Sequence, residues 1–564
     1  MAMTIEEAHA TLTAPGQMFE IETVEVDGHP VKTWKNAPPS LRAVLEQSQG
    51  RGDLGFLVYE YETLTFEEHF RAAAHLARIL VERYGVAKGD RVAIAMRNYP
   101  EWSVAFWAAA AVGAVIVPLN AWWTAPELVY GFEDSGSKVV FLDEERAERL
   151  ADELPKLGLA GAIVAEASKA PPAGVERWED VLGDVPADAT LPEVDVTPDD
   201  LATIFYTSGT TGKPKGALGT QRNICSNLLS LVFANARRGL RAAAPDAPDA
   251  AGGQNTYLLS VPFFHATGCH SVLVANLAFG GKIVIMHKWD AGRALELIER
   301  ERVTTFGGVP AMVWQVLEHP DFEKRDISSV KSIGYGGAPA PPELVRRIEA
   351  MFPGRTPSNG YGLTETSSVT TMNNGDDYLR KPDSVGVPVA VCEVKVVDPA
   401  TGEEVPVGEV GELWIKGPNV VKGYWNKPEA TEAAFGGGWF KSGDGARLDD
   451  EGFVYIVDRI KDMVIRGGEN VYCAEIEAAM FEHPEVSDVA VIGVPHDVLG
   501  EEVGAVVLRV PGSTVTAEEL QQHVRERLAA FKVPTHFFFR DEPMPRNPQG
   551  KILKRELKDE LLPK

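Results

Sequence analysis

The residues from Tyr206 to Gly216 form the stretch of this chain best equipped to bind phosphate groups. The stretch reads Tyr-Thr-Ser-Gly-Thr-Thr-Gly-Lys-Pro-Lys-Gly and directly follows the apolar run Leu201 to Phe205. Glycines allow backbone N–H groups to turn toward one point, while hydroxyls add donors and lysines add positive charge. The combination predicts a polyphosphate site, with ATP as the first ligand to consider.

This phosphate run, as residues 206–216 are called below, is not a Walker A loop. Only two residues separate Gly209 from Gly212, and Lys213 is followed by Pro214 rather than by Ser or Thr. In a Walker A loop that Ser or Thr binds Mg²⁺. A different scheme of nucleotide binding is therefore needed. A plain solvated loop after a strand is the structural alternative, and the density of donors disfavours it.

Segments further along the chain carry groups suited to a nucleotide and its metal. Gly334 to Pro339 contains glycines, over which a flat ring can approach the backbone. Tyr361 could stack on a base, and Glu365 offers a hard carboxylate oxygen to Mg²⁺. Asp444 and Arg459 each place a charge at a predicted turn. Taken alone, Asp444 fits a turn residue and Arg459 a surface ion pair equally well.

The hydrophobic pattern predicts the scaffold that must position these groups. Thr65 and Glu68 form a capping box ahead of apolar residues at helical spacing, which predicts a helix. Short apolar runs between helical patterns predict buried strands at residues 91–96, 139–142, 162–165, 203–205 and 283–286. We therefore expect an α/β fold in which stacked sheets are covered on both faces.

The second half of the chain changes character twice. Runs at 394–398, 412–416 and 453–457 with glycine-rich turns predict an antiparallel β section. Beyond Asp458, the runs 486–494, 503–510, 517–528 and 536–540 predict a compact α+β unit of normal domain size. We expect a large N-terminal domain at 1–460 and a small mobile C-terminal domain at 461–564. Residues 237–255, rich in Ala, Pro, Asp and Gly, are expected to be a mobile surface insertion.

Charge and composition exclude several classes of function. The chain has 564 residues and a formal charge of −26, from 81 acidic and 55 basic residues. Such a surface repels nucleic acid and anionic membranes, so a polyanionic ligand must be held by local positive groups. The four cysteines form no Cys-x-x-Cys pair, which disfavours zinc and disulfides and favours a reducing cytoplasm. The amino terminus does not resemble a signal peptide.

One uncharged stretch, Trp102 to Trp123, is long enough to be tested as a membrane span. Gly113 and Pro118 interrupt it, Asn120 lies within it, and Val115 to Val117 is a β-branched run. A buried helix that leads into a buried strand accounts for all of these features. We therefore expect no transmembrane segment.

Taken in order, the chemical segments resemble the adenylate-forming superfamily, which includes acyl-CoA synthetases, firefly luciferase and peptide-synthetase adenylation domains. The resemblance extends from about Thr65 to Lys551, and it is carried by residues 206–216, 262–268, 334–339, 359–365, 441–444 and 458–470, with Gly550-Lys551 near the end. It is closest to acyl-CoA synthetases of the fatty-acid type. The resemblance implies a reaction in which a carboxylate attacks the α-phosphate of ATP, pyrophosphate leaves, and a thiol then displaces AMP.

The same resemblance implies roles for individual residues. Glu365 and Thr207 would hold Mg²⁺, and Lys551, Glu365, Thr364 and His265 would form the catalytic set, with His265 as a pocket wall and gate rather than a base. Lys551 would stabilise the charge that develops between the carboxylate and the α-phosphate. The residues assigned to ATP and to the co-substrate CoA are Thr207, Ser208, Gly209, Thr210, Thr211, Gly212, Lys215, Gly337, Ala338, Pro339, Gly360, Tyr361, Gly362, Asp444, Arg459, Gly467 and Gly468.

The resemblance also implies movement of the small domain about Lys461. Lys551 would occupy space in the first step that the thiol needs in the second, so the domain must swing between them. On the structural alternative, Lys551 is a solvated lysine and Gly468 part of a tight turn.

The leading hypothesis from the sequence is an ATP-dependent acyl-CoA synthetase acting on medium- or long-chain fatty acids. Ala266, Thr267 and Gly268 are small and leave room for an acyl group between the apolar rings of Phe263 and Phe264. An aryl or phenylpropanoid acid, transfer to a carrier protein, luciferase-type oxidation, and a nucleotide sensor without turnover are the alternatives. A homodimer is compatible with the sequence.

Overall fold

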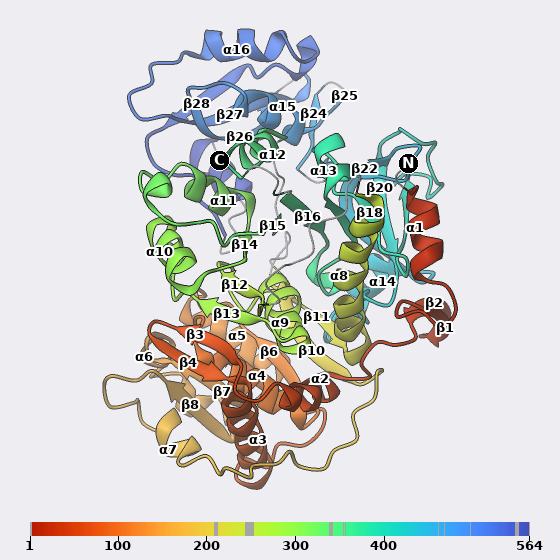
Figure 1. Ribbon diagram of the computed structural model, residues 1–564. Helices are drawn as coiled ribbons and strands as arrows, with labels where there is room; N and C mark the ends of the chain where they lie inside the picture. The colour runs from red at the N-terminus through yellow and green to blue at the C-terminus, as the bar shows by residue number, and fades with distance from the viewer. Residues whose placement is uncertain are drawn as a thin grey trace.

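The computed structural model describes residues 3–207, 213–242, 253–337, 342–352, 355, 357–460, 462–466, 469–496, 498–547 and 552–562 (Figure 1). Within these residues the chain forms a large N-terminal part with three major sheets and a smaller C-terminal part with its own sheet. The small part, with α15 and α16, lies at the top of the molecule in Figure 1. The expected α/β class is confirmed.

The first large sheet carries the phosphate run. Its order is β11-β10-β6-β5-β7-β8-β9, and all neighbouring pairs are parallel except β10 with β11. The strands are β5 (Arg91–Ala95), β6 (Val115–Pro118), β7 (Ser137–Asp143), β8 (Gly161–Ala165), β9 (Glu176–Arg177), β10 (Leu201–Thr207) and β11 (Lys215–Thr220). The strands predicted in this region are therefore present, since buried parallel strands need apolar residues on both faces.

A layer of helices separates this sheet from the second one. Buried side chains of α2 (Leu41–Ser48), α3 (Phe66–Glu82) and α4 (Pro100–Ala111) form one core cluster with Val92 and Ile94 of β5 and with strands of the second sheet. Ala93 and Ala95 point to the opposite face, where they pack with α5 (Ala125–Ser135) and α6 (Glu144–Arg149). The helix α3 begins with the predicted capping box, because Glu68 N donates to Thr65 Oγ1 at 3.1 Å.

The uncharged stretch at 102–123 forms a buried helix followed by a buried strand, as predicted. Its α4 portion leads into β6, and Trp102, Phe106 and Trp107 are each 0 % exposed. In the described part of the chain, no helix combines the length and the apolar character that crossing a bilayer requires.

The second large sheet has the order β18-β17-β16-β15-β14-β12-β13-β3-β4. Its strands are β3 (Gly55–Tyr59), β4 (Glu62–Thr65), β12 (Thr256–Leu259), β13 (Lys282–Ile285), β14 (Thr305–Gly308), β15 (Ser332–Gly336), β16 (Pro357–Tyr361), β17 (Thr371–Asn374) and β18 (Val387–Pro388). Its other face is covered by α10 (Ala291–Glu301), α11 (Pro310–Leu317) and α12 (Pro342–Met351). A Cβ on Gly336 would lie 2.4 Å from Gly360 O, so a side chain cannot fit there.

The predicted antiparallel section and the predicted C-terminal unit both appear as separate sheets. The former consists of β19 (Glu393–Val397), β20 (Gly411–Lys416), β21 (Phe435–Gly436), β22 (Trp439–Leu448) and β23 (Val454–Arg459). The latter contains β24 (Val464–Arg466), β25 (Glu469–Val471), β26 (Val486–His496), β27 (Gly500–Arg509) and β28 (His536–Arg540), with α15 (Cys473–Phe481), α16 (Ala517–Arg525) and α17 (Lys554–Leu561). Sheet membership changes between β23 and β24, and a domain division at 460/461 remains our proposal.

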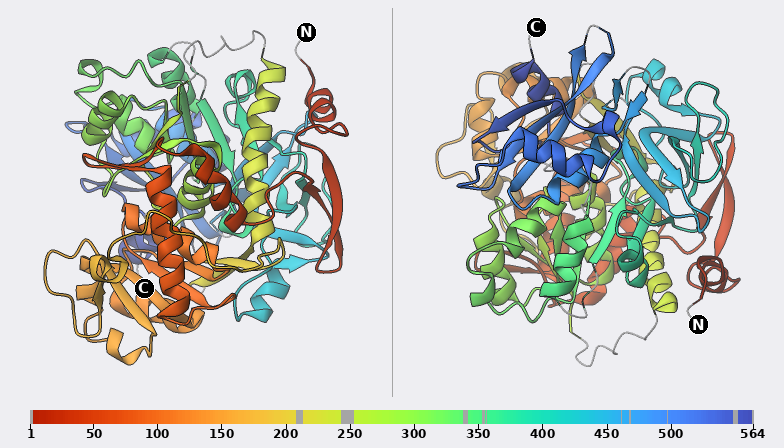
Figure 2. Two further views of the ribbon diagram at one scale, coloured as in Figure 1. Left: turned by 60° about the horizontal axis from the view of Figure 1, so that its bottom comes forward. Right: turned by 90° about the horizontal axis from the view of Figure 1, so that it is seen from above.

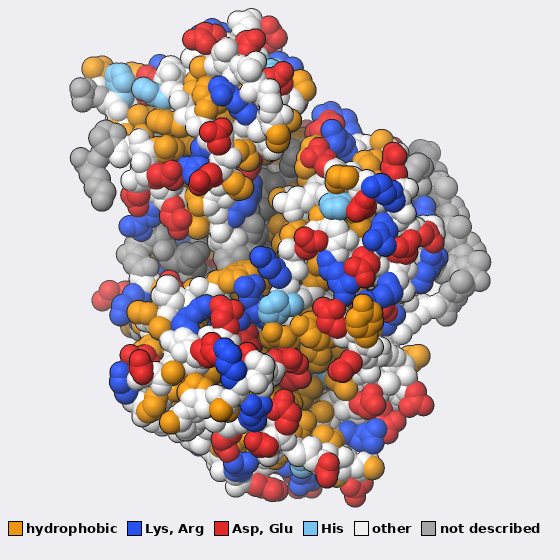
Figure 3. All heavy atoms as spheres, turned by 90° about the vertical axis from the view of Figure 1, so that its left-hand side faces the viewer, with side chains coloured by type: hydrophobic (Ala, Val, Ile, Leu, Met, Phe, Trp, Pro, Cys, Tyr) orange, Lys and Arg blue, Asp and Glu red, His pale blue; other side chains and the backbone are white. Residues whose placement is uncertain are grey.

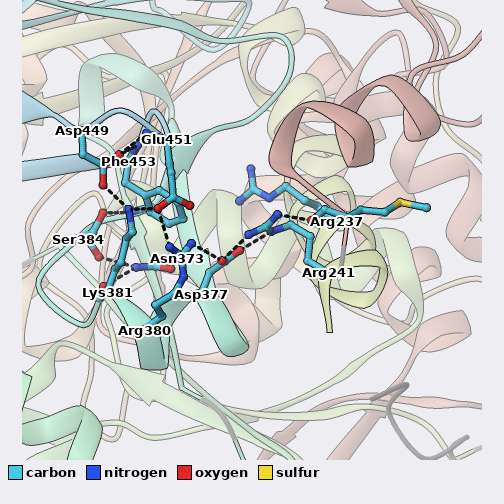
Figure 4. A network of polar contacts seen from close by, with 12 residues as sticks. Arg237, Arg241, Asn373, Asp377, Arg380, Lys381, Ser384, Asp449, Glu451 and Phe453 are labelled. Carbon is cyan, nitrogen blue, oxygen red and sulfur yellow. Dashed lines mark hydrogen bonds and ion pairs between the residues drawn. The ribbon is translucent and has the colours of Figure 1, made fainter. Parts of the chain in front are cut away.

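The expected surface insertion at 237–255 is wrong at its start. The helix α8 (Gln221–Arg241) includes residues 237–241, and Arg237 is only 2 % exposed. Arg237 donates to Met372 O at 2.7 Å. Arg241 donates to both carboxylate oxygens of Asp377 at 2.6 Å (Figure 4). These partners lie far away in sequence, so local composition could not indicate them. Residues 243–252 lie outside the described residues.

Residues 3–34 form a folded layer on α8. Figure 2 shows α1 (Ile5–Leu12) and the hairpin of β1 (Ile21–Val26) and β2 (His29–Trp34) on the same side of the molecule as this helix. Trp34 Nε1 donates to Ser230 Oγ at 3.0 Å, and the Trp34 and Phe233 rings lie 5.1 Å apart. The N-terminal segment is therefore part of the N-terminal core.

We expect the buried histidine His69 to make folding less stable in mild acid. The side chain of His69 is 0 % exposed, and burial lowers its pKa to about 3. An unfolded histidine takes up a proton near pH 6.5, so below that pH the unfolded state binds more protons and the free energy of unfolding falls. Between pH 7.5 and pH 5 the free energy of unfolding should fall by about 2 kcal/mol because of this residue.

Urea unfolding at both pH values tests this expectation with His69→Gln. The amide can keep a hydrogen bond to Ser103 Oγ, which lies 2.8 Å from His69 Nε2 in the wild-type chain. The variant should lose less unfolding free energy at pH 5 than the wild type, whereas His536→Gln at an exposed position should behave as the wild type. An equal acid loss in His69→Gln and wild type would contradict the assignment.

Candidate active site

The two ends of the phosphate run are held side by side by the β10–β11 hairpin. In its register Tyr206 lies opposite Gly216 and Thr207 lies opposite Lys215. Thr207 Oγ1 donates to Lys215 O at 3.4 Å. The predicted ligands Ser208, Gly209, Thr210, Thr211 and Gly212 lie outside the described residues. The hairpin thus fixes the flanks from which a phosphate-binding turn would extend.

Tyr361, Asp444 and Arg459 are brought together from three strands. Tyr361 ends β16, and the β22–β23 register places Asp444 opposite Arg459. Tyr361 Oη donates to Asp444 Oδ2 at 2.6 Å, and Arg459 Nε lies 2.5 Å from Asp444 Oδ1. Each carboxylate oxygen retains a second lone pair, so Asp444 can still accept from the hydroxyls of a sugar.

Burial and charge set the protonation states in this cluster. Asp444 is 4 % exposed. Burial, reinforced by Asp444, raises the pKa of Tyr361 well above its ordinary value, so its hydroxyl remains a donor. Burial alone would lower the pKa of Arg459, but the carboxylates of Asp444 and Glu365 outweigh it and raise that pKa. The Arg459 cation is therefore stable despite its surroundings.

Local hydrogen bonds explain why β22 presents Asp444 in this direction. Ser442 Oγ donates to Leu413 O at 2.6 Å and accepts from Asp444 N at 3.1 Å. Gly443 between them has φ +71°, a backbone conformation that favours glycine. Its N–H donates to Glu412 Oε1 at 3.1 Å. Ser442 and Gly443 thus set the orientation of the Asp444 carboxylate.

Glu365, the candidate metal ligand, lies in a short 3₁₀ turn at Thr364–Thr366, directly after β16. Its side chain is largely buried, and Oε1 accepts from Tyr424 Oη at 2.8 Å. The ammonium of Lys215 lies 4.8 Å from the centre of the Tyr424 ring. Tyr424 therefore connects the phosphate run to Glu365. Burial, together with Glu365, raises the pKa of Tyr424, which keeps its hydroxyl protonated.

The donor set near Glu365 fits Mg²⁺ better than a metal held entirely by protein. In the described residues no group of three or more His, Cys, Asp or Glu side chains could hold a metal ion. Mg²⁺ is commonly bound by one or two carboxylates together with waters and substrate phosphates. One buried carboxylate beside a phosphate run matches that pattern.

The turn that carries Glu365 is closely packed against its own chain. A Cβ on Gly362 would lie 1.3 Å from Ser368 O, and Ser367 and Ser368 have φ of +50° and +108°. Ser271 Oγ and Ser368 Oγ lie 2.6 Å apart, which ties this turn to the π-helix Thr267–Val274. The geometry of the turn is thus fixed from two sides.

Gly362→Ala is therefore expected to lower ATP-dependent activity at least tenfold. The added methyl group would overlap a backbone carbonyl, so the segment that carries Glu365 must shift, and displacements of about 1 Å in a catalytic group cost on the order of a hundredfold in rate. Pyrophosphate release measures the effect. Gly239→Ala is the control, since a Cβ there meets nothing within 4 Å. Wild-type rates in Gly362→Ala would contradict this account.

His265 lies in an aromatic wall next to that π-helix. The His265 and Phe264 rings are 4.8 Å apart, and Phe264 meets Trp122 at 5.5 Å. Burial lowers the pKa of His265 to about 3, so the imidazole is neutral near pH 7. His270 Nδ1 lies 3.1 Å from Ser367 O and links the wall to the Glu365 turn. A wall role for His265 remains our proposal.

Some of the other predicted residues lie within the described part of the structure, and the rest lie outside it. Gly337, with φ +75°, directly follows β15, Gly360 lies in β16, and Thr364 opens the Glu365 turn. Outside the described residues lie Ala338, Pro339, Lys461, Gly467, Gly468 and Lys551. Sequence reasoning missed Tyr424, which stands in the segment Lys-Gly-Tyr-Trp-Asn-Lys outside every motif that the sequence marked.

Comparison with known proteins now tests the resemblance. Residues 44–425 match the model of the AMP-binding enzyme family, and residues 475–551 match that of the AMP-binding enzyme C-terminal domain. The chain belongs to the AMP-binding enzyme family. The prediction from the sequence motifs is confirmed, and this AMP-binding enzyme is an AMP-forming acid–thiol ligase that uses ATP and CoA.

Relatives of this AMP-binding enzyme include ligases for aryl acids and for alkyl acids. A feruloyl-CoA synthase of Amycolatopsis sp is 38% identical over 88% of this chain and 93% of its own. A long-chain-fatty-acid–CoA ligase of Bacillus subtilis (strain 168) is 33% identical over 92% of this chain and 94% of the ligase. The crystal structure of ATP-bound MatB from Rhodopseudomonas palustris matches with a TM-score of 0.79 and 31% identity. The match covers 92% of this chain and 99% of the MatB chain.

Proposed function

We propose that this enzyme makes CoA thioesters of monocarboxylic acids with an uncharged apolar tail, medium- or long-chain fatty acids first among them. One observation carries the proposal: the segments beside the expected acyl site hold no fixed charge. Residues 259–274 are mostly apolar, and so are residues 306–313, which lie against them, since a Cβ on Gly308 would be 2.4 Å from Ser260 Oγ. The ionisable residues of the two segments are His265, Cys269 and His270.

All three of these groups are neutral near pH 7. Burial lowers the pKa of His265 to about 3 and that of His270 to about 4. Burial also raises the pKa of the Cys269 thiol well above its ordinary value. These two segments would therefore offer no charged partner to a second carboxylate or an ammonium on the acid, and an ion buried without a partner costs several kcal/mol. An alkyl tail suffers no such loss.

In the first step the acid attacks the α-phosphate of ATP and pyrophosphate leaves. The phosphate run, with Lys215, would hold the outer phosphates, and Asp444 with Arg459 would hold the ribose. Glu365 and Thr207 would hold Mg²⁺, which supplies positive charge to phosphate oxygens. Thr364 would reach the α-phosphate, and Lys551 would neutralise charge between it and the incoming carboxylate.

In the second step the thiol of CoA attacks the acyl carbonyl and AMP leaves. Gly467 and Gly468 would line the path of the thiol, since glycine leaves a narrow passage open. A swing of the small domain about Lys461 would remove Lys551 and admit the thiol. The neutral imidazole of His265 would serve as a wall of the acyl site in this step.

A hydroxycinnamate-type aryl acid is the second candidate. It is favoured by the 38% identity to a protein named feruloyl-CoA synthase. An aryl acid with neutral substituents meets the same requirement for an uncharged tail, so the wall residues admit both classes.

A panel of acids tests the proposal. Straight-chain acids from two to eighteen carbons, cinnamate and ferulate, a dicarboxylic acid and an amino acid are each supplied with ATP, Mg²⁺ and CoA, and pyrophosphate and the CoA ester are measured. We expect the highest kcat/KM with medium- or long-chain acids. A preference for ferulate would select the second candidate, and a preference for the dicarboxylic acid or the amino acid would overturn both.

A further inference from the structure

Asp134 lies on α5, outside the phosphate run, and is hydrogen-bonded to the first residue of that run. Its side chain is 10 % exposed, and its Oδ2 accepts a hydrogen bond from Tyr206 Oη at 2.8 Å. Its Oδ1 lies 3.0 Å from the ammonium of Lys427, and its backbone oxygen accepts from Trp425 Nε1 at 3.0 Å. One residue thus joins the start of the run to the segment 425–427.

The same helix also holds the other end of the run. Tyr130 lies one turn before Asp134 on α5, and its hydroxyl donates to Pro214 O at 3.1 Å. The ammonium of Lys213 lies 4.7 Å from the centre of the Tyr130 ring. The run is therefore anchored to α5 on both sides of residues 208–212.

The segment reached by Asp134 also carries the partner of Glu365. Trp425 N donates to Gly216 O at 2.8 Å, and the preceding residue Tyr424 donates to Glu365. Through Lys427 and Trp425, Asp134 is thus connected to the candidate metal ligand as well as to the run. Its position links the two groups that must face one triphosphate.

Charge balance agrees with a positioning role. A buried carboxylate near a polyphosphate site would repel the ligand unless a cation neutralised it. Lys427 supplies that cation, and its hydrogen bond to Asp134 raises the pKa of Lys427. Burial, followed by Asp134, raises the pKa of Tyr206, so its hydroxyl stays a donor. Asp134 thus forms an ion pair with Lys427 and accepts one hydrogen bond from Tyr206.

We propose that Asp134 is a positioning residue for ATP: it holds the phosphate run at a fixed distance from the Glu365 turn without touching the nucleotide. This inference rests on the proposed function, because it assigns ATP to the run. It adds a residue of α5, outside every motif that the sequence marked, to those on which nucleotide affinity depends.

Asp134→Asn tests the proposal, since asparagine keeps the size but loses the charge and one acceptor. The lost hydrogen bond is one to a charged group, so loosening the run should weaken ATP binding about tenfold or more. We expect the Kd of ATP with Mg²⁺, measured by calorimetry without acid, and the KM for ATP to rise by that factor. The KM for the acid and the thioester rate from supplied acyl-adenylate should stay within about twofold.

Asp377→Asn is the matched control for a merely structural effect. Asp377 is a similarly buried carboxylate that binds two arginines, Arg241 and Arg380, in the network of Figure 4. It should lower the melting temperature at least as much as Asp134→Asn and leave the Kd for ATP unchanged. Tyr206→Phe should weaken ATP binding too, and the double variant with Asp134→Asn should lose less than the product of the two effects.

The outcomes separate this inference from the proposed function. Unchanged ATP affinity in Asp134→Asn, or an equal rise in the KM values for ATP and for the acid, would overturn the positioning role alone. Equal weakening of ATP binding in Asp377→Asn would also overturn it, because the effect would then be one of stability. A wild-type chain that binds no ATP would overturn both.

Discussion

Lys551→Ala is expected to lower the rate of acyl-adenylate formation on the order of a hundred- to a thousandfold. The proposed role of this ammonium is to neutralise charge that develops between the carboxylate and the α-phosphate, and removal of one such group has a cost of that size. Thioester formation from supplied acyl-adenylate should stay within about twofold of wild type, since that step does not use the lysine. Acid-dependent pyrophosphate release and CoA consumption measure the two half-reactions separately.

The structure shows how the residues on both sides of Lys551 are held, and it offers a control lysine for this experiment. Arg546 pairs with Ile552 in an isolated antiparallel bridge, and Lys554 Nζ lies 2.7 Å from Glu477 Oε1, so described contacts hold both flanks of residues 548–551. Lys558→Ala on α17 removes an ammonium that is partly exposed and should change neither half-reaction. Equal loss of both half-reactions in Lys551→Ala would contradict the assigned role.

Glu365→Gln is expected to lower adenylation about a hundredfold and to raise the concentration of Mg²⁺ needed for half-maximal rate. Glutamine can still accept from Tyr424, so the packing is kept while the negative charge that Mg²⁺ requires is lost. Titration of Mg²⁺ at fixed ATP and acid, with pyrophosphate as the readout, measures both effects.

Glu176→Gln is a matched control for Glu365→Gln. Glu176 also accepts from a tyrosine hydroxyl, that of Tyr84 at 2.7 Å, but it lies on β9 at the far edge of the first sheet. It should leave the Mg²⁺ requirement unchanged. A wild-type Mg²⁺ titration in Glu365→Gln would remove this residue from the metal site.

The parts of the fold that the sequence predicts well are those with a local physical signal. Buried strands such as β5 and β7 appear as apolar runs because both of their faces are covered, and the capping box at Thr65 marks the start of α3. The candidate ligands Tyr361, Asp444 and Arg459 stand near glycines at predicted strand ends or turns, and the family resemblance assigned Asp444 and Arg459 to the nucleotide. The structure brings Tyr361 and Arg459 each within hydrogen-bonding distance of Asp444.

The parts that the sequence does not predict depend on contacts between distant segments. Asp134 and Tyr424 lie outside the motifs that the sequence marked, and only the fold brings them to the phosphate run and to Glu365. The start of the expected insertion at residue 237 was wrong because Arg237 and Arg241 find their partners more than a hundred residues away. The roles of Lys551, Gly467 and Gly468 stay predictions, since these residues lie outside the described part of the chain.

The layer formed by residues 3–34 affects how the protein can be shortened. The family model begins at residue 44, so a chain trimmed to match it would lack α1 and the β1–β2 hairpin. Phe233, now 0 % exposed, would face solvent, and Arg237 would lose its neighbour His9. Newly exposed aromatic surface of this kind promotes self-association, so a chain used for solution work on this ligase should keep α1 and the β1–β2 hairpin.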